Sequence, residues 1–195
     1  MSSEGISLEP LTESVMAPIF VWDNRDNIFW SVKGYYAGMN LQFANKLLFN
    51  SDDYGIFSGF VNGYHSLPRI TNGLTLAWHF FIQKGWGKLP YLRYASYGQG
   101  DDVTGYTRGK YVNYAEVTVQ TELRYEVWKF ISCGGYMGTG KVCSSFEVFG
   151  QSAWLHFGGL RAYFNIIPSR NIRLRLDCAI ARKDWGFYIG IGQGF

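Results

Sequence analysis

Few side chains in this sequence have the type and spacing that catalysis requires, although one segment has the spacing of a nucleotide-binding motif. Residues 135–141 read Gly-Tyr-Met-Gly-Thr-Gly-Lys, which fits a phosphate-binding glycine-rich loop. Such a loop needs a Ser or Thr next, to hold a metal ion, and a surrounding alternation of strands and helices. Val142 follows here, and the flanking sequence does not alternate in this way. We therefore interpret residues 135–141 as structural.

The three histidines also give little indication of catalysis or metal binding. His65, His79 and His156 lack the close spacing of a metal site. A hydrolase embedded in a membrane would need a Ser or Thr nucleophile within reach of a His base. Ser66 adjoins His65 and Thr75 lies near His79, but adjacent residues of a strand point to opposite faces. The sequence thus predicts no catalytic residue, no cofactor and no metal, with such a hydrolase as a minor alternative.

Charged residues recur at alternate positions in three late segments, where the residues between them are apolar. The charged set comprises Glu122, Arg124, Arg161, Arg173, Arg175 and Asp177. Period-2 alternation is typical of strands with one apolar and one polar face. Because both signs occur on neighbouring segments, we expect internal ion pairing that fixes the register. A ring selective for one kind of ion would carry a single sign.

Nine segments of this alternating kind can be drawn along the chain, each followed by a turn. They are residues 15–23, 34–44, 54–65, 73–83, 113–127, 129–137, 156–166, 171–181 and 185–195. Their length and the Trp and Tyr residues near their ends favour an antiparallel transmembrane β-barrel. Mean hydropathy near zero (−0.08) agrees, because a barrel places its apolar residues at alternate positions. A soluble β-sandwich with charged faces in water is the alternative.

The last segment, residues 185–195, is the most informative one. Phe187, Ile189, Ile191 and Phe195 fall on one face of the predicted strand, and small or polar residues fall on the other. A final strand with an apolar outer face and an aromatic carboxyl-terminal residue is typical of a bacterial outer-membrane barrel. We expect these four residues to act as the terminal-strand signal for the barrel's own insertion.

Length, composition and charge exclude several other classes of protein. The length of 195 residues fits one domain, which we place at residues 15–195 after a linker at 1–14. Residues 1–10 have neither the basic nor the apolar region of a signal peptide, although an outer-membrane protein must be exported. The net charge of +3 and the scattered basic residues argue against nucleic-acid binding. Three distant cysteines do not indicate a disulfide framework.

Taken in order, several segments resemble the barrel of the bacterial surface antigen family, the BamA/TamA-type outer-membrane proteins. The resemblance runs from about residue 17 to Phe195 and is most like the short Bacteroidetes-type members without periplasmic repeats. It rests on residues 22–27 with 33–35, 103–111, 121–125, 136–142, 158–161, 173–177 and the terminal strand. Residues 103–111, Val-Thr-Gly-Tyr-Thr-Arg-Gly-Lys-Tyr, are similar to the family's lumen-loop motif. The motif positions are Thr104, Gly105, Tyr106, Arg108, Gly109 and Tyr111.

The chain departs from the family pattern in two ways. Thr104 stands where the family has an Arg, and Gly138 stands where it has the acidic partner. Losing both partners costs less than losing one, since a lone confined charge costs several kcal/mol. Either Arg108 with Glu122 holds the loop instead, or the contact is lost and Arg108 is a solvated loop residue. The second departure is that the family barrel has sixteen strands, so the nine segments match its carboxyl-terminal half.

The resemblance implies an integral outer-membrane protein that assists insertion or translocation of other polypeptides and is not an enzyme. Its implied partners are outer-membrane lipid, unfolded outer-membrane proteins and subunits of an assembly machinery. The loop at residues 85–113 would fold into the lumen, and residues 185–195 would form one side of a seam to which a substrate strand adds. A passive pore or structural barrel, or a truncated non-functional fragment, remains the alternative.

Overall fold

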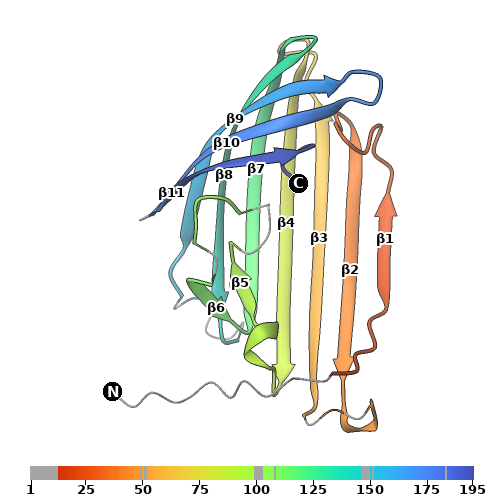
Figure 1. Ribbon diagram of the computed structural model, residues 1–195, viewed down its shortest axis with the longest axis vertical. Coiled ribbons are helices and arrows are strands. Elements are labelled where there is room, and N and C mark those ends of the chain that lie inside the picture. The colour runs from red at the N-terminus through yellow and green to blue at the C-terminus, as the bar shows by residue number, and fades with distance from the viewer. Residues whose placement is uncertain are drawn as a thin grey trace.

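The computed structural model describes residues 13–48, 50, 52–98, 103–107, 109–145, 150, 152–182 and 184–195. Its main element is a nine-stranded antiparallel sheet in the order β1-β2-β3-β4-β7-β8-β9-β10-β11 (Figure 1). The strands are β1 (Ile19–Asp23), β2 (Gly34–Ala44), β3 (Tyr54–Ser66), β4 (Leu74–Gly87), β7 (Ala115–Trp128), β8 (Ile131–Cys143), β9 (Leu155–Ile167), β10 (Ile172–Ala181) and β11 (Trp185–Ile191). Two short 3₁₀ helices, η1 (Lys46–Leu48) and η2 (Tyr91–Arg93), and a two-stranded hairpin of β5 (Ala95–Tyr97) and β6 (Tyr111–Asn113) complete the described elements.

The all-β antiparallel fold is confirmed, and each predicted segment corresponds to one strand of the sheet. Residues 135–141 lie within β8, so their glycines belong to a strand and not to a phosphate loop. Consecutive strands are joined as hairpins, apart from the longer connection between β4 and β7. The turn after β9 shows how the hairpins close. The N–H of Arg170 donates to the carbonyl of Ile167 at 3.1 Å, and Asn171 adopts a left-handed φ of 55°.

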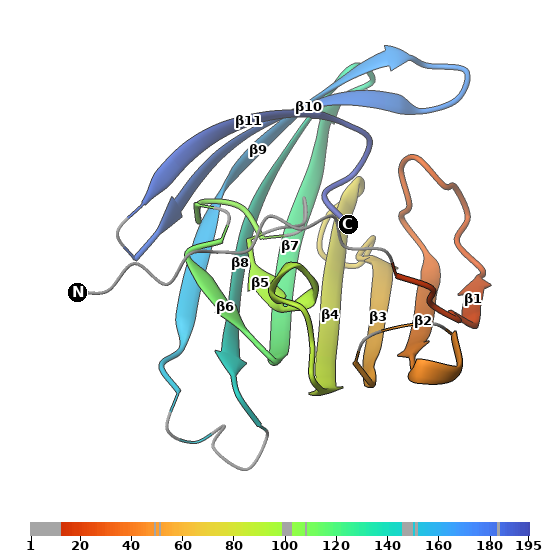
Figure 2. The ribbon, with the colours of Figure 1, turned by 60° about the horizontal axis from the view of Figure 1, so that its bottom comes forward.

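The sheet curls strongly but is not closed. Figure 2 shows β9, β10 and β11 bending over the other strands, so that the sheet has a convex outer face and a concave face. β1 and β11 are the edge strands, and no pairing joins them within the described part of the chain. The structure therefore shows a curved open sheet.

The connection between β4 and β7 lies against the concave face (Figure 2). The loop predicted at residues 85–113 is shorter than expected and contains regular elements: β4 continues to Gly87, and the connection holds η2 and the β5–β6 hairpin. Three-residue strands are too short to show a periodicity in the sequence. Tyr97 of β5 is fully buried and packs edge-on against Phe157 of β9, at 6.2 Å between ring centroids. The connection thus belongs to the core.

The expected position of Phe195 is wrong. β11 ends at Ile191, and Gly192 takes a φ of 91° while its N–H donates to the carbonyl of Arg173 at 2.7 Å. Only glycine adopts this backbone conformation readily, so the chain turns here. The carboxyl terminus consequently lies inside the curve of the sheet (Figure 2), while Phe187, Ile189 and Ile191 stay on the outer face.

Candidate functional site

The six predicted charged residues lie together on the concave face. Antiparallel register pairs Asp177 of β10 directly with Arg161 of β9. Glu122 and Arg124 lie two residues apart on β7 and therefore share one face. Ion pairs link five of the six in series, and Arg173 pairs separately with Glu126, also on β7, beside them; we call these seven residues the interior network. Its members are Glu122, Arg124, Glu126, Arg161, Arg173, Arg175 and Asp177.

Glu122 is the centre of the interior network. One oxygen, Oε2, lies 2.7 Å from Nη1 of Arg161 and 3.3 Å from Nε of Arg124. The other, Oε1, accepts a hydrogen bond from the hydroxyl of Tyr163. Space for this carboxylate comes from Gly134 on β8, because a Cβ there would lie 2.9 Å from Oε1. All the charged partners are buried, so the carboxylate is compensated by protein groups alone.

Asp177 and the two late arginines extend the interior network. Asp177 lies 3.0 Å from Nε of Arg175 and 3.5 Å from Nε of Arg161. Arg173 pairs with Glu126 at 2.5 Å and also donates to the hydroxyl of Ser132. Each arginine thus has a carboxylate beside it, which is the condition for burying a guanidinium group without a large desolvation cost.

Glu126 and Trp30 contribute to the interior network but were not among the residues predicted from the sequence. Glu126 continues the alternation of Glu122 and Arg124, so its position carried a usable signal. Trp30 lies in the β1–β2 loop, and nothing in its spacing marked it. Its ring lies 3.8 Å from the guanidinium carbon of Arg173 and 5.0 Å from that of Arg124, and its indole N–H donates to Glu126 at 3.1 Å. These contacts hold the loop against the concave face.

The lumen-loop motif residues contact the late strands. The Thr104 hydroxyl lies 2.6 Å from the Tyr136 hydroxyl of β8, and the N–H of Gly105 donates to the Tyr188 hydroxyl of β11 at 3.0 Å. The Tyr106 hydroxyl donates to the carbonyl of His156 at 2.8 Å. Thr104 thus contacts β8, the strand that contains Gly138, through a hydrogen bond between two neutral hydroxyls. The resemblance implied an ion pair at the positions of Thr104 and Gly138.

The remaining motif positions are more peripheral. Gly109 has a φ of 74°, and no atom lies within 4 Å of where its Cβ would be. Tyr111 starts β6 and packs edge-on against Tyr106 at 5.6 Å. Arg108 lies outside the described residues, so its suggested pairing with Glu122 is untested. Beside the motif, Lys110 pairs with Asp184 of the β10–β11 turn at 2.6 Å, and this hydrogen bond raises the pKa of Lys110. Burial raises the pKa of Tyr106.

The outer face has the opposite character. Large apolar side chains on neighbouring strands are exposed there, among them Met137 at 70 % and Leu160 at 71 %. Exposed tryptophans mark both ends of this face. Trp22 and Trp128 lie at the end of the sheet that carries the β7–β8 turn, and Trp86, Trp154 and Trp185 lie at the other end.

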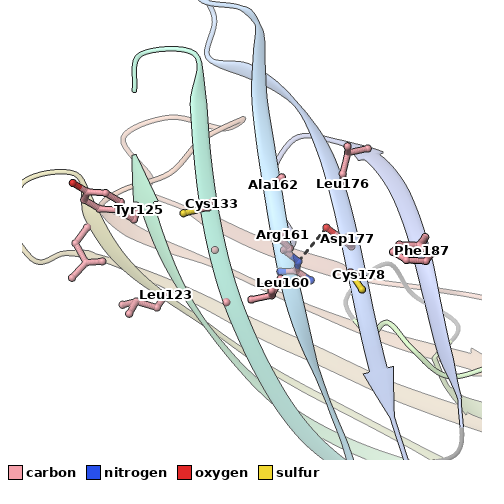
Figure 3. A pocket seen from close by; sticks show the side chains of 13 residues that line it. Leu123, Tyr125, Cys133, Leu160, Arg161, Ala162, Leu176, Asp177, Cys178 and Phe187 are labelled. Atoms are coloured by element: carbon pink, nitrogen blue, oxygen red, sulfur yellow. Dashed lines mark ion pairs between the residues drawn. The ribbon is translucent and has the colours of Figure 1, made fainter. Parts of the chain in front are cut away.

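A shallow groove of about 700 Å³ crosses the outer face over β7 to β11 (Figure 3). Its lining includes the small residues Cys133, Gly135, Ala162 and Cys178, bordered by larger ones such as Leu123 and Phe187. Arg161 and Asp177 also contribute, although their side chains are buried. The thiols of Cys133 and Cys178 are free and exposed. The groove therefore has a mostly apolar lining, like the exposed side chains around it.

The histidines have structural partners. Nδ1 of His79 lies 2.6 Å from the side-chain oxygen of Asn62, and both residues are buried on the concave face. His65 accepts a hydrogen bond from the indole of Trp78 at 3.2 Å. Within the described ranges, no group of three or more His, Cys, Asp or Glu side chains is arranged to hold a metal ion. None of the helices described there has the length and apolar character needed to cross a membrane.

No protein-family model matches the chain, and a search of curated proteins finds no significant match.

Proposed function

We propose that this chain forms the carboxyl-terminal part of an outer-membrane β-barrel of the BamA/TamA type, which assists the insertion or translocation of other polypeptides. One observation carries the membrane assignment. The strands expose their apolar residues and bury their charged ones, with tryptophans at both ends of the apolar face. A protein folded in water would be destabilised by this arrangement, whereas a bilayer solvates the outer face.

The height of the outer face supports a bilayer. Outward-facing residues of β7 run from Val117 to Val127, ten residues apart. An antiparallel strand rises about 3.4 Å per residue, which gives ~34 Å along the strand. A tilt of about 45° reduces this to ~24 Å, close to the ~25 Å apolar band of outer-membrane barrels.

The open edges support a larger assembly. All neighbouring strands are antiparallel, so β1 and β11, the first and ninth in the sheet, run in the same direction. An odd number of further strands is therefore needed to close an antiparallel barrel, giving an even total as in bacterial single-chain barrels. Two copies of this sheet would not close such a barrel, because β11 of one copy would lie parallel to β1 of the other. Seven further strands would complete sixteen, as the resemblance implies.

The terminal strand supports a seam. β11 has seven residues, against thirteen in β3, and pairs on one side only. Gly186 and Gly190 offer little side-chain packing, which weakens a strand. A short edge strand of this kind is suited to exchange of partners, and an incoming strand would add to its unpaired N–H and C=O groups.

Folding of a second barrel protein tests the proposal. The intact protein is placed in phospholipid vesicles, and the rate at which an added unfolded barrel protein becomes protease-resistant is compared with empty vesicles. Gly192 and the even-numbered residues of β11 before it direct their N–H groups to β10, so the unpaired edge presents those of odd-numbered residues such as Ile189. We expect acceleration by the wild type and by Ile189→Val, and its loss in Ile189→Pro, because proline removes an N–H from the edge. Absence of acceleration by the wild type would reject the assembly role. Ion conductance that changes with Arg173 or Arg175, without acceleration, would favour a passive pore.

A further inference from the structure

The last four residues, Gly192–Phe195, form a carboxyl-terminal tail with its own set of contacts on the concave face. The strand pattern would carry this tail past the end of β11 along the sheet. The turn at Gly192 directs it inward instead, and the carbonyl of Gln193 accepts a hydrogen bond from Nη1 of Arg175 at 2.7 Å. The interior network therefore contacts the tail backbone directly.

Gln193 connects three separate parts of the chain. Its side-chain oxygen accepts from the N–H of Ser31 at 3.0 Å and from Nη1 of Arg124 at 3.2 Å. Its side-chain nitrogen donates to the Ser31 hydroxyl and the Tyr64 hydroxyl, both at 3.1 Å. The β1–β2 loop, β3 and β7 thus all bind one amide group, which uses both of its hydrogen-bonding ends.

Gly194 and Phe195 fit the same site closely. A Cβ at position 194 would lie 2.0 Å from Nη1 of Arg161, so a larger residue cannot be placed there without moving a buried arginine. The ring of Phe195 lies 5.4 Å from the ring of His79 and stacks on Tyr64 at 6.5 Å. The Tyr64 hydroxyl donates to the terminal oxygen of Phe195 at 2.5 Å.

Arg124 also approaches the tail, because its guanidinium carbon lies 5.9 Å from the centroid of the Phe195 ring.

From these contacts we infer that the concave face contains a peptide-binding site for a Gly-Gln-Gly-Phe segment, and that the chain's own tail occupies it. Ser31, Tyr64, Arg124 and Arg175 recognise the segment, and Arg161 requires glycine at its third position. The site ties the end of β11 to the β1–β2 loop, so β11 cannot move away from the concave face before the tail leaves. This inference stands independently of the proposed membrane role.

Digestion of the intact protein by a carboxypeptidase, followed by mass spectrometry, tests whether the tail is held. Gln193→Ala removes the amide contacts, and Gly194→Val cannot fit beside Arg161. Hydrogen bonds to charged groups contribute about 1.5–3 kcal/mol, so we expect release of the tail residues to be at least about tenfold faster in both variants. Ile191→Val, on the outer face just before the tail, is the matched control and should digest at the wild-type rate. Equal rates in all four proteins would overturn the inference.

A peptide added in trans tests the site itself and guards against a variant that merely misfolds. A fluorescent peptide Gly-Ile-Gly-Gln-Gly-Phe should bind Gly194→Val protein, whose own tail is displaced, and should bind the wild type at least tenfold more weakly. Adding Tyr64→Phe should weaken binding, and so should replacing the Gln of the peptide by Ala. Failure of the peptide to bind Gly194→Val protein with unchanged circular dichroism, or equal binding of the peptide with Ala, would contradict the assigned site.

Discussion

The two faces of strands β7 to β10 come from the same sequence pattern yet end in opposite environments. On the outer face, apolar side chains such as Leu123 and Leu160 are exposed. On the concave face, Glu122 and Arg161 are almost completely buried. In a water-soluble sheet the two sets would exchange places, with the apolar face in the core. The comparison teaches that the concave face of this sheet depends on compensated charge, and that the outer face depends on its solvent.

Removing the central carboxylate should have the largest effect. Glu122→Gln leaves Arg124 and Arg161 without their shared partner, and breaking a buried pair costs about 3–5 kcal/mol. Thr121→Val changes the adjacent outward-facing residue and should alter stability by less than ~0.5 kcal/mol, as surface substitutions do. Denaturant unfolding of both variants measures the difference. Similar losses at the two positions would show that the faces do not differ as described.

A charge on the outer face should have the next largest effect, and one that depends on depth. Leu123→Arg lies midway along β7 and should cost about 2–4 kcal/mol in a bilayer. Val127→Arg lies beside Trp128 at the end of the strand and should cost about 0–1 kcal/mol, because the cost falls near the interface. Unfolding in lipid vesicles measures both. Equal and negligible costs at the two depths would indicate a face in water.

The contact between the loop and β8 should contribute less. Thr104→Val and Tyr136→Phe each remove one hydroxyl of a buried hydrogen bond, and such bonds contribute about 0.5–1.5 kcal/mol net. A double-mutant cycle should give a coupling of about 1 kcal/mol, since the residues are in direct contact. Thr107→Val, in the same loop, serves as the control. Strict additivity of the two substitutions would mean that this hydrogen bond does not hold the loop.

The smallest effect concerns pH and the exposed pair of Lys110 and Asp184. The hydrogen bond raises the pKa of Lys110 above that of the unfolded chain. The contribution of the pair is thus fully present below the ordinary lysine pKa of about 10.4, and is lost as the pH rises through the raised folded value. Titration of the Lys110 side chain by NMR should show this delay, and Asp184→Asn should remove it. Titration at or below the ordinary value would contradict the pairing.

The sequence predicted the strands well because side-chain alternation is a local property. Glu122, Arg124 and their apolar neighbours on β7 required only a period of two. The tail was not predictable in this way. Phe195 continues the outer alternation of Ile189 and Ile191, and only the left-handed backbone at Gly192 redirects it.

Contacts between distant segments could not be predicted from side-chain alternation either. Trp30 contacts Arg173 because the β1–β2 loop folds over the concave face. The spacing of residues in the sequence does not indicate this position of the loop.

Thr104 contacts the neutral hydroxyl of Tyr136, a partner that the sequence did not indicate. The pairing suggested for Arg108 with Glu122 stays a prediction, because Arg108 lies outside the described residues. The sheet is open between β1 and β11 in the described part of the chain, and side-chain alternation does not indicate whether a sheet closes.

The native thiols give the most direct test that the outer face lies in lipid. Cys133 and Cys178 both line the outer groove, whereas Cys143 is buried. The intact protein in vesicles is treated with a charged, water-soluble thiol reagent, and modification at each cysteine is followed by mass spectrometry, with the denatured protein as the reference. The account predicts that Cys133 and Cys178 react far more slowly in vesicles than after denaturation. Rapid reaction of both in the folded protein, at the rate of water-exposed thiols, would contradict it.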